Sequence, residues 1–578
     1  MSNLRLASLV LEHLNNSYVE DIILCAGARN SPFLYLLDPS QSSNSLHQHP
    51  FKIYNHFEER SACFFALGNS MQKARPTAII TTSGTAAAEL LPACIEAYYS
   101  SIPLILITAD RPTNYRGTGA PQSIEQLGIF SSYANSFDLS NERDLINFIS
   151  HFKSDNTFDF SKPLHLNICF EEPLIDDPNF NLNIEKIQIK NSLDKPKQVV
   201  QKINLNHSEE SSDELGAISN FCQNTKSPLV LVSGLFDNEQ QIVYNFLKSY
   251  PGPCFVEATS GLKFATDNQL QCSEVFLKKC FDKKLFDGLI RIGGVPTSRI
   301  WRDLEITLKD IPVLSFSQRK WTGLARKSAI VQNLESITNN TISDCHWDWS
   351  SEIFSMDKYF RSLQDKIIIA HPNSEQGLIH GLSKLVKTHP LYLGNSLPIR
   401  EWDSFSTTSP TTPSTKTEAP SRQSFQKIIA NRGANGIDGQ LSTYFGWAKS
   451  FGQSYALFGD LTTLYDLTAP WIINQTPTST NFNICIMNNH GGMIFDKMFK
   501  KEIFLNRHKL DFKNWSQMWN LNYLIINEFN SETFNSISSL ALNKYSEQSK
   551  SYVLELIPYT HSTDLVHAEL ELLWKNKF

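Results

Sequence analysis

The stretch TAIITTSGTAAAELLPACIEAYYSSIPLILITADRP, residues 77–112, indicates the fold class of this chain. Two short apolar runs, Thr77–Thr82 and Leu104–Thr108, have the length and composition of buried strands, and a helical stretch separates them. Turn residues follow each run, namely Ser83-Gly84-Thr85 and Asp110-Arg111-Pro112. Strands that alternate with helices predict a parallel α/β sheet.

The residues before this stretch repeat its pattern. Asp21–Ala26 is a third strand candidate, and the turn Gly27-Ala28-Arg29 follows it. Residues 1–16 predict an amphipathic helix, in which Leu6, Leu9, Val10 and Leu14 share one face. Because functional groups gather at the carboxyl ends of parallel strands, we expect the three turns to lie at one edge of the sheet.

The chain continues in the same style and is too long, at 578 residues, for a single core. We predict three domains: 1–190, a central α/β domain at 191–355, and 356–578. Residues 191–214 are polar and predict a linker, and residues 404–424 are rich in Ser, Thr and Pro and predict a mobile loop. Further strands are predicted at 228–233, 288–292, 312–316, 390–393, 454–458, 483–487 and 551–556.

Composition excludes several classes of partner. The net charge of −6 gives no basic surplus for nucleic acid or an acidic membrane. Apolar runs stay shorter than the ~20 residues of a membrane span, and the start has no secretory signal, so we expect a cytoplasmic protein. The ten cysteines form no CxxC pair, which is typical of a reducing compartment; Cys169 and Cys485 lie in apolar runs and are expected in the core.

A candidate metal site follows two of the later strands. Gly459-Asp460 comes after one of them, and Asn488-Asn489-His490-Gly491-Gly492 comes after the next. A carboxylate, an amide and a carbonyl beside glycine form an oxygen-only ligand set, which Mg²⁺ prefers. The alternative is a pair of ordinary surface turns, because Asp, Asn and Gly are common turn residues.

The sequence HFEER at residues 56–60 marks a predicted helix start near Asn55 or His56. Glutamates in a first helical turn usually complement the helix dipole. One buried Glu among them could instead hydrogen-bond an aminopyrimidine ring and so activate thiamine. The residues alone leave both interpretations open.

Eight motifs in the same order along the chain resemble those of the 2-succinyl-5-enolpyruvyl-6-hydroxy-3-cyclohexene-1-carboxylate synthase family. NRGANGIDG is the most specific of them, because general thiamine-diphosphate enzymes lack it. The resemblance implies an α/β fold of three domains, each a parallel sheet flanked by helices. The matching stretches are GARNSP (27–32), HFEER (56–60), TSGTAA (82–87), TADRP (108–112), GNSL (394–397), NRGANGIDGQLST (431–443), GDLTTLYDL (459–467) and NNHGGMIF (488–495).

The resemblance also implies which residues hold the cofactor. Glu59 would activate the pyrimidine of thiamine diphosphate, and Ile437 would be the apolar wedge that keeps the cofactor bent. Mg²⁺ or Mn²⁺ would be bound by Asp460, Asn489 and the backbone carbonyl of Gly491. The cofactor site would be lined by Ser396, Leu397, Leu461 and Thr462.

The resemblance also implies a group of residues that bind the two substrates, 2-oxoglutarate and isochorismate, both of which are dianions. Guanidinium groups bind carboxylates through two parallel hydrogen bonds, whereas the ordinary explanation for a single arginine is a solvated surface charge. The predicted substrate residues are Arg29, Arg111, Gln122, Arg319, Arg400 and Arg432, with Ile494 and Phe495 as an apolar wall.

The family resemblance implies decarboxylation of 2-oxoglutarate and conjugate addition of the remaining four-carbon unit to isochorismate, a step of menaquinone or phylloquinone synthesis. It implies a homodimer or homotetramer, because the cofactor lies between the first domain of one subunit and the last domain of another. Ala28 departs from the family, which has Ser there, so one substrate hydrogen bond is either absent or made by Asn30. Two alternatives are another thiamine-dependent 2-oxo acid carboligase, which would not need paired arginines, and a cofactor-binding protein without turnover.

Overall fold

A computed structural model of the chain describes residues 2–38, 47–150, 162–177, 179–184, 211–337, 342, 345–407, 425–542 and 551–576. The predicted linker at 191–214 and the loop at 404–424 lie largely outside these residues. Contacts group the chain into two compact units. The first unit comprises residues 1–205, 431–450 and 465–479, and the second comprises 206–430, 451–464 and 480–578.

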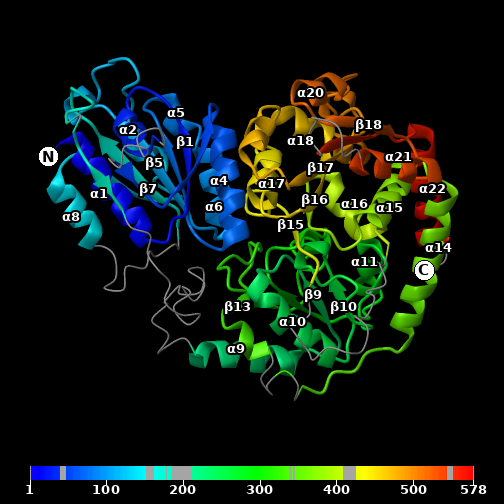
Figure 1. Cartoon of the computed structure of the whole chain (residues 1–578). Coiled ribbons are helices and arrows are strands. Elements are labelled where there is room, and N and C mark those ends of the chain that lie inside the picture. The colour runs from blue at the N-terminus through cyan, green and yellow to red at the C-terminus, as the bar shows by residue number, and fades with distance from the viewer. Residues whose placement is uncertain are drawn as a thin grey trace, which may run out of the picture. The chain divides into compact units, whose positions relative to one another are not determined.

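The first unit contains a six-stranded parallel sheet in the order β3-β1-β4-β5-β7-β6, flanked by helices (Figure 1). Its strands are β1 (Asp21–Cys25), β3 (Lys52–His56), β4 (Thr77–Thr81), β5 (Leu104–Asp110), β6 (Asn135–Leu139) and β7 (Leu164–Cys169). Its helices include α1 (Asn3–Asn16), α2 (Ser31–Leu37), α4 (Glu59–Lys73), α5 (Thr85–Ala88), α6 (Leu91–Ser100), α7 (Gln126–Ile129), α8 (Glu142–Ser150) and α17 (Gln440–Ala448). The three strands predicted for this region are confirmed.

The predicted amphipathic helix is confirmed as α1. Leu6, Val10 and Leu14 are buried in one core cluster together with strand residues such as Ile22 and Ile80, and Leu9 packs against that cluster. The predicted helix start near Asn55 or His56 is wrong. Strand β3 extends to His56, and α4 begins at Glu59 because the Glu58 side chain caps it.

The second unit contains two further parallel sheets. The central sheet has the order β10-β9-β11-β12-β13, and the last has the order β15-β14-β16-β17-β19-β18. Their strands are β9 (Pro228–Val232), β10 (Cys254–Val256), β11 (Gly288–Ile292), β12 (Val313–Phe316), β13 (Ala329–Val331), β14 (Leu391–Leu393), β15 (Ile428–Ile429), β16 (Gln453–Gly459), β17 (Asn481–Met487), β18 (Asn522–Ile526) and β19 (Tyr552–Leu556). Helices of this unit include α9 (Ser211–Asn224), α10 (Asp237–Ser249), α11 (Glu274–Asp282), α14 (Glu352–Ala370), α15 (Glu375–Val386), α16 (Leu397–Phe405), α18 (Asp460–Tyr465), α19 (Asp496–Phe499), α20 (Lys513–Met518), α21 (Ser531–Leu542) and α22 (Thr560–Asn576). All seven strands predicted in these two sheets are present, and the predicted α/β class is confirmed.

The cysteines expected in the core are buried, but two other cysteines form a disulfide that the sequence did not predict. Cys169 and Cys485 are buried and free, as expected. Cys222 of α9 and Cys345 form a disulfide, because the fold brings their Cα atoms to 5.8 Å although 123 positions separate them. Because these cysteines are so far apart in the sequence, their spacing gave no indication of the disulfide.

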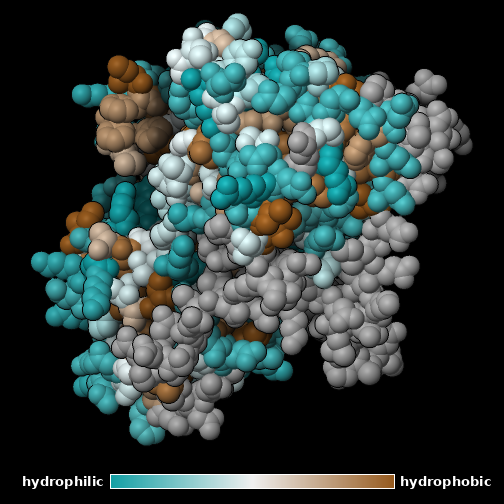
Figure 2. Space-filling model, turned by 90° about the vertical axis from the view of Figure 1, so that its left-hand side faces the viewer, coloured by the Kyte–Doolittle hydropathy of each residue, from teal (hydrophilic) through white to brown (hydrophobic). Residues whose placement is uncertain are grey.

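The hydropathy of the described residues can be followed along their helices and over one face of the surface. No helix among these residues is both long and apolar enough to cross a bilayer. On the face shown in Figure 2, hydrophobic residues form small separate groups among hydrophilic ones. Small apolar groups of this kind are normal on a protein surface.

Helices α4 and α17 pack against each other through glycines. A Cβ added to Gly68 would lie 1.9 Å from the carbonyl oxygen of Thr443, and one added to Gly446 would lie 2.1 Å from that of Phe65. Both oxygens belong to the backbone and cannot rotate away. We therefore expect Gly68→Ala to destabilise the protein by about 1–3 kcal/mol, measured by thermal or urea unfolding.

A matched control for this substitution lies in α9, where a Cβ on Gly216 would meet nothing within 4 Å. Gly216→Ala should leave stability unchanged or raise it by up to about 1 kcal/mol, because alanine favours helix. Equal stability of the two variants would show that α4 and α17 are not packed this closely.

Candidate active site

One edge of the first sheet collects four of the predicted motifs. Strand β1 pairs in parallel with β3 and β4, and β4 pairs with β5, so their carboxyl ends point the same way. The GARNSP, HFEER, TSGTAA and TADRP motifs follow or overlap these four strand ends. The turn after β1 touches the one after β4: a Cβ on Gly27 would lie 2.5 Å from the Thr82 side chain, and the Arg29 N–H donates to Thr82 Oγ1 at 3.3 Å.

Glu59 is the first residue of α4 and is half-buried at this edge. Burial raises the pKa of its carboxyl group, and the negative charges of Glu58 and Glu89 raise it further. The neighbouring Glu58 has a different task, because it accepts hydrogen bonds from the backbone N–H groups of Arg60 and Ser61. Of these two neighbouring glutamates, Glu59 is thus the one whose pKa is raised, whereas the pKa of Glu58 is lowered.

Three predicted substrate residues of the first unit lie on loops near these strand ends. Arg29 is buried, and its guanidinium lies 3.0 Å from the carboxylate of Glu172. The Nε–H of Arg111 donates to the Pro121 carbonyl at 2.8 Å. Gln122 is exposed and has a positive φ of 57°, an uncommon backbone conformation that concentrates at functional sites.

The NRGANGIDG segment, residues 431–439, also belongs to the first unit. Glu96 of α6 accepts hydrogen bonds from the backbone N–H groups of Gly433 and Ala434, both at 2.7 Å. Gly439 has a φ of 63°, and a Cβ there would collide with the ring of Phe64 at 1.8 Å. These contacts fix the segment that carries Arg432 and Ile437, both half-buried.

The predicted metal ligands follow two neighbouring strands of the second unit. Strands β16 and β17 are parallel neighbours, and Asp460 and Asn489 follow their carboxyl ends. The Asp460 carboxylate is buried and accepts hydrogen bonds from Gly491 N–H at 2.9 Å and Leu461 N–H at 2.6 Å. Burial raises the pKa of Asp460, and these hydrogen bonds oppose that rise.

The residues of this cluster fit a hard divalent cation. The carboxylate, amide and carbonyl oxygens of Asp460, Asn489 and Gly491 form an oxygen-only set. Gly491 has a φ of 144°, and a Cβ there would lie 2.5 Å from the Leu505 carbonyl oxygen, so only glycine suits this turn. A divalent cation held by these residues would supply positive charge for the diphosphate of a cofactor.

Two further residues, which no sequence motif indicates, border the cluster of Asp460 and Asn489. The Asn489 amide nitrogen donates to the carboxylate of Glu375, which leaves the amide oxygen as the group suited to a cation. His508 Nε2 lies 3.2 Å from Asp460 Oδ2. Neither residue lies in a motif, and Glu375 precedes Asn489 by 114 positions, so no local spacing could have indicated them.

The remaining predicted cofactor residues of the second unit lie at the N-terminal ends of α16 and α18. Ser396 precedes α16 and has a strained φ of 76°, and its carbonyl oxygen accepts a hydrogen bond from Arg400 at 2.7 Å. Leu397 opens α16 and is half-buried. Leu461 and Thr462 lie in the first turn of α18, beside Asp460.

The other predicted substrate residues lie at separate positions. Ile494 and Phe495 form a short helical turn, η6 (Met493–Phe495), in which the Phe495 side chain is exposed. Arg319 follows β12 of the central sheet, donates to the Gly234 carbonyl at 2.9 Å and covers the ring of Phe236. These contacts hold the Arg319 side chain beside the central sheet, and its contact with substrate stays a prediction.

Asn30 does not replace the missing hydroxyl at position 28. Its side-chain oxygen accepts from Gly27 N–H at 2.9 Å, and its amide nitrogen donates to the Cys25 carbonyl at 2.8 Å. The side chain is fully buried within its own turn. The expectation that Asn30 could contact the substrate is therefore wrong, because this amide closes the turn itself.

Parallel α/β sheets, a carboxyl group at Glu59 and oxygen donors around Asp460 are the features expected of a thiamine-diphosphate enzyme. The sequence profile described as "Thiamine pyrophosphate enzyme, N-terminal TPP binding domain" matches residues 4–129. The chain is 40% identical over the full length of both proteins to the 2-succinyl-5-enolpyruvyl-6-hydroxy-3-cyclohexene-1-carboxylate synthase of Bdellovibrio bacteriovorus. It is 33% identical over 95% of each chain to the synthase of that name from Akkermansia muciniphila, and 27% identical over 88% of each to that of Lysinibacillus sphaericus. The chain belongs to the 2-succinyl-5-enolpyruvyl-6-hydroxy-3-cyclohexene-1-carboxylate synthase family.

Proposed function

We propose that this chain releases CO₂ from 2-oxoglutarate and joins the remaining four-carbon unit to isochorismate by conjugate addition. The product would be the compound that gives the family its name, an intermediate of menaquinone or phylloquinone synthesis. The observation that carries the proposal is the oxygen cluster in which Gly491 N–H binds the Asp460 carboxylate next to Asn489. Such a cluster suits the metal-bound diphosphate of the cofactor.

The cofactor would be held at both of its ends. Asp460, Asn489 and the Gly491 carbonyl would bind Mg²⁺ or Mn²⁺, and Ser396, Leu397, Leu461 and Thr462 would line the site. Glu59 would hydrogen-bond the aminopyrimidine ring, and Ile437 would support the bent conformation. Bound thiamine diphosphate supplies a carbon nucleophile and accepts the electron pair that CO₂ leaves behind.

The protein's own contribution to the reaction is orientation and exclusion of water. The two substrates carry four carboxylates, and the guanidinium groups of the five predicted arginines would bind and orient them. The exposed side chain of Phe495, together with Ile494, would shield the reacting carbon from water. This shielding matters because protonation from water would release succinic semialdehyde instead of product. The five arginines are Arg29, Arg111, Arg319, Arg400 and Arg432.

We propose a homodimer or homotetramer, since the family resemblance places the two halves of each cofactor site on different subunits. Size-exclusion chromatography with light scattering would separate these states from a monomer. The cytoplasmic location stays a prediction from the sequence.

The direct test of the proposed function uses purified full-length protein. Incubation with thiamine diphosphate, Mg²⁺, 2-oxoglutarate and isochorismate should lower the absorbance of isochorismate while CO₂ is released in equal amount. Replacement of 2-oxoglutarate by pyruvate should abolish the reaction, because pyruvate lacks the second carboxylate. Turnover of pyruvate instead would identify a different carboligase, and absence of CO₂ from both acids would indicate a binding protein without turnover.

A further inference from the structure

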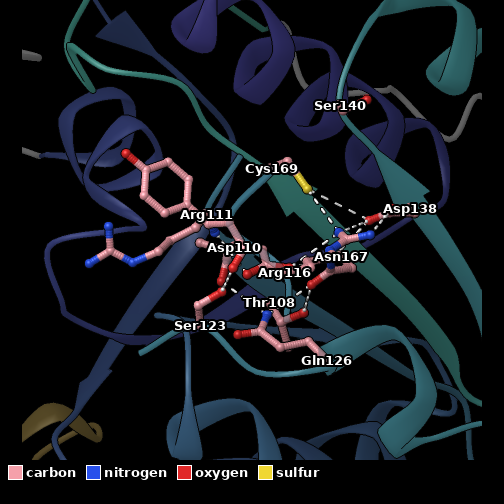
Figure 3. A network of polar contacts seen from close by, with 12 residues as sticks. Thr108, Asp110, Arg111, Arg116, Ser123, Gln126, Asp138, Ser140, Asn167 and Cys169 are labelled. Atoms are coloured by element: carbon pink, nitrogen blue, oxygen red, sulfur yellow. Dashed lines mark hydrogen bonds and ion pairs between the residues drawn. The ribbon is translucent and has the colours of Figure 1, made fainter. Parts of the chain in front are cut away.

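A network of buried and half-buried polar side chains lies beside Arg111 (Figure 3). The loop that begins at Arg111 also carries Gln122. The network spans the carboxyl ends of β5, β6 and β7, which are neighbouring parallel strands. It centres on Asp110, the last residue of β5, whose side chain is fully buried. One oxygen of Asp110 accepts the backbone N–H of Arg111 at 2.8 Å, so the network begins at a predicted substrate residue.

Arg116 connects the loop to two strands at once. Its guanidinium forms two parallel hydrogen bonds with the Asp138 carboxylate, at 2.7 and 2.8 Å, and a third with Asp110 at 3.2 Å. Burial alone would raise the pKa of Asp138, but hydrogen bonds from Arg116 and Asn167 outweigh it and hold that pKa below its usual value. Burial raises the pKa of the nearby Cys169 thiol, which stays neutral. Arg116 is therefore the cation of a network with two carboxylates.

Asn167 and Gln126 carry the network to the other end of the loop. The Asn167 amide nitrogen donates to Asp110 at 3.0 Å and to Asp138 at 2.8 Å, and its oxygen accepts from Gln126 at 2.8 Å. The oxygen of Gln126 accepts the backbone N–H of Gly84 at 2.8 Å. All of these bonds lie within hydrogen-bonding range, and Asn167 and Gln126 are fully buried.

Gly84 in turn contacts Gln122. It has a φ of 83°, and a Cβ there would lie 3.3 Å from the Cα of Gln122. The network thus touches the backbone on both sides of the loop, at Arg111 and beneath Gln122.

The loop itself has little apolar anchorage. Residues 113–115, 117–119, 121 and 122 are exposed, whereas the Arg116 side chain is 26% exposed and reaches down to the strands. Apart from Pro112 at its start, the loop has no buried side chain, so it depends largely on polar contacts for its conformation. The Arg116–Asp138 pair, with two parallel charge-assisted hydrogen bonds, is the kind of polar contact that contributes most to holding such a loop.

We propose that Arg116 is a positioning residue for the substrate site: its pair with Asp138, backed by Asp110, holds the 111–122 loop so that Arg111 and Gln122 face the same substrate. This inference rests on the proposed function for the roles of Arg111 and Gln122. We call the contacts of Arg116 with Asp138 and Asp110 the clamp. The clamp lies within the first unit and can be tested without substrate. We assign Arg116 no contact with the cofactor, so its removal should leave cofactor binding intact.

The first arm of the test measures the loop directly by hydrogen–deuterium exchange on the purified protein. Arg116→Met and Asp138→Asn should each speed exchange in peptides covering residues 113–121 by about tenfold or more, with little change in α1. Arg143→Met is the matched control, because Arg143 lies exposed on α8 of the same unit. Unchanged exchange in both clamp variants would overturn the proposal, whatever the enzyme's activity.

The second arm measures steady-state kinetics. Arg116→Met should raise the KM for 2-oxoglutarate or isochorismate by about tenfold or more, while the dissociation constant of thiamine diphosphate stays within about twofold of wild type. Arg116→Lys keeps the charge without the planar fork and should recover part of the loss. The double variant Arg116→Met with Asp138→Asn should have a KM no higher than that of the more impaired single variant. Both changes break the same ion pair, so their effects should not add.

These results separate the clamp from the proposed function. A lower kcat at unchanged KM would mean only a smaller folded fraction and would overturn the positioning role. Wild-type protein without turnover, but with exchange that depends on Arg116, would refute the proposed function and keep the clamp. If Arg116→Met does not fold, Asp138→Asn and Arg116→Lys provide the same comparisons.

Discussion

Glu59→Gln should lower turnover by about 10²–10⁴-fold, the usual range for loss of a general acid–base group. The amide matches the carboxylate in size but cannot share a proton with the pyrimidine ring of the cofactor. Because burial and the charges of Glu58 and Glu89 raise the pKa of Glu59, this carboxyl group holds a proton more readily than an exposed one. The measurement is kcat in the isochorismate assay, with CO₂ release as a second readout.

The control for this prediction is Glu89→Gln, at an exposed carboxylate that contributes to the raised pKa of Glu59. It removes a neighbouring charge of the same kind and should change turnover by only a few-fold, since its effect on Glu59 is screened by water. The affinity for thiamine diphosphate should survive in Glu59→Gln, because the metal cluster is unchanged. Retention of more than about a tenth of wild-type turnover in Glu59→Gln would contradict the role assigned to this residue.

Several of the strands that the sequence predicted are buried along their whole length. Strands β1, β4 and β5 are continuous apolar runs between turn residues, and every residue in them is buried. The edge strands β3 (KIYNH) and β6 (NSFDL) were not predicted, because their exposed and buried positions mix polar and apolar residues. The same polar character of β3 led to the helix start being placed too early, at a point where the chain is still a strand.

The candidate site was predictable to the extent that its residues lie in local motifs. Asp460 and Asn489 are recognised from the residues around them, and the structure brings their neighbourhood together through the Asp460–Gly491 hydrogen bond. Glu375 and Arg116 make their contacts with residues 114 and 22 positions away, respectively, and their own surroundings carry no signature. Such partners follow from the strand order of the sheets, which the sequence alone did not determine.

Asp460→Asn should weaken binding of thiamine diphosphate by about 10²-fold or more in the presence of Mg²⁺, since a neutral amide replaces the carboxylate in the cation's ligand set. The change also disturbs the cluster itself, because the carboxylate accepts the Gly491 and Leu461 N–H groups. Titration of cofactor against tryptophan fluorescence or by calorimetry measures the loss. In wild-type protein, removal of the metal with a chelator should produce a similar loss of affinity.

Two comparisons make this result specific. Asp511→Asn, at an exposed aspartate of the same unit, should bind cofactor as wild type does. Gly491→Ala should weaken binding as Asp460→Asn does, because its Cβ would meet the Leu505 carbonyl oxygen at 2.5 Å and displace the turn. Tight, Mg²⁺-dependent binding by Asp460→Asn would place the metal elsewhere. The contributions of Glu59 and Asp460 can thus be measured separately. A change at Glu59 should lower kcat while the cofactor stays bound, and a change at Asp460 should lower the affinity for the cofactor.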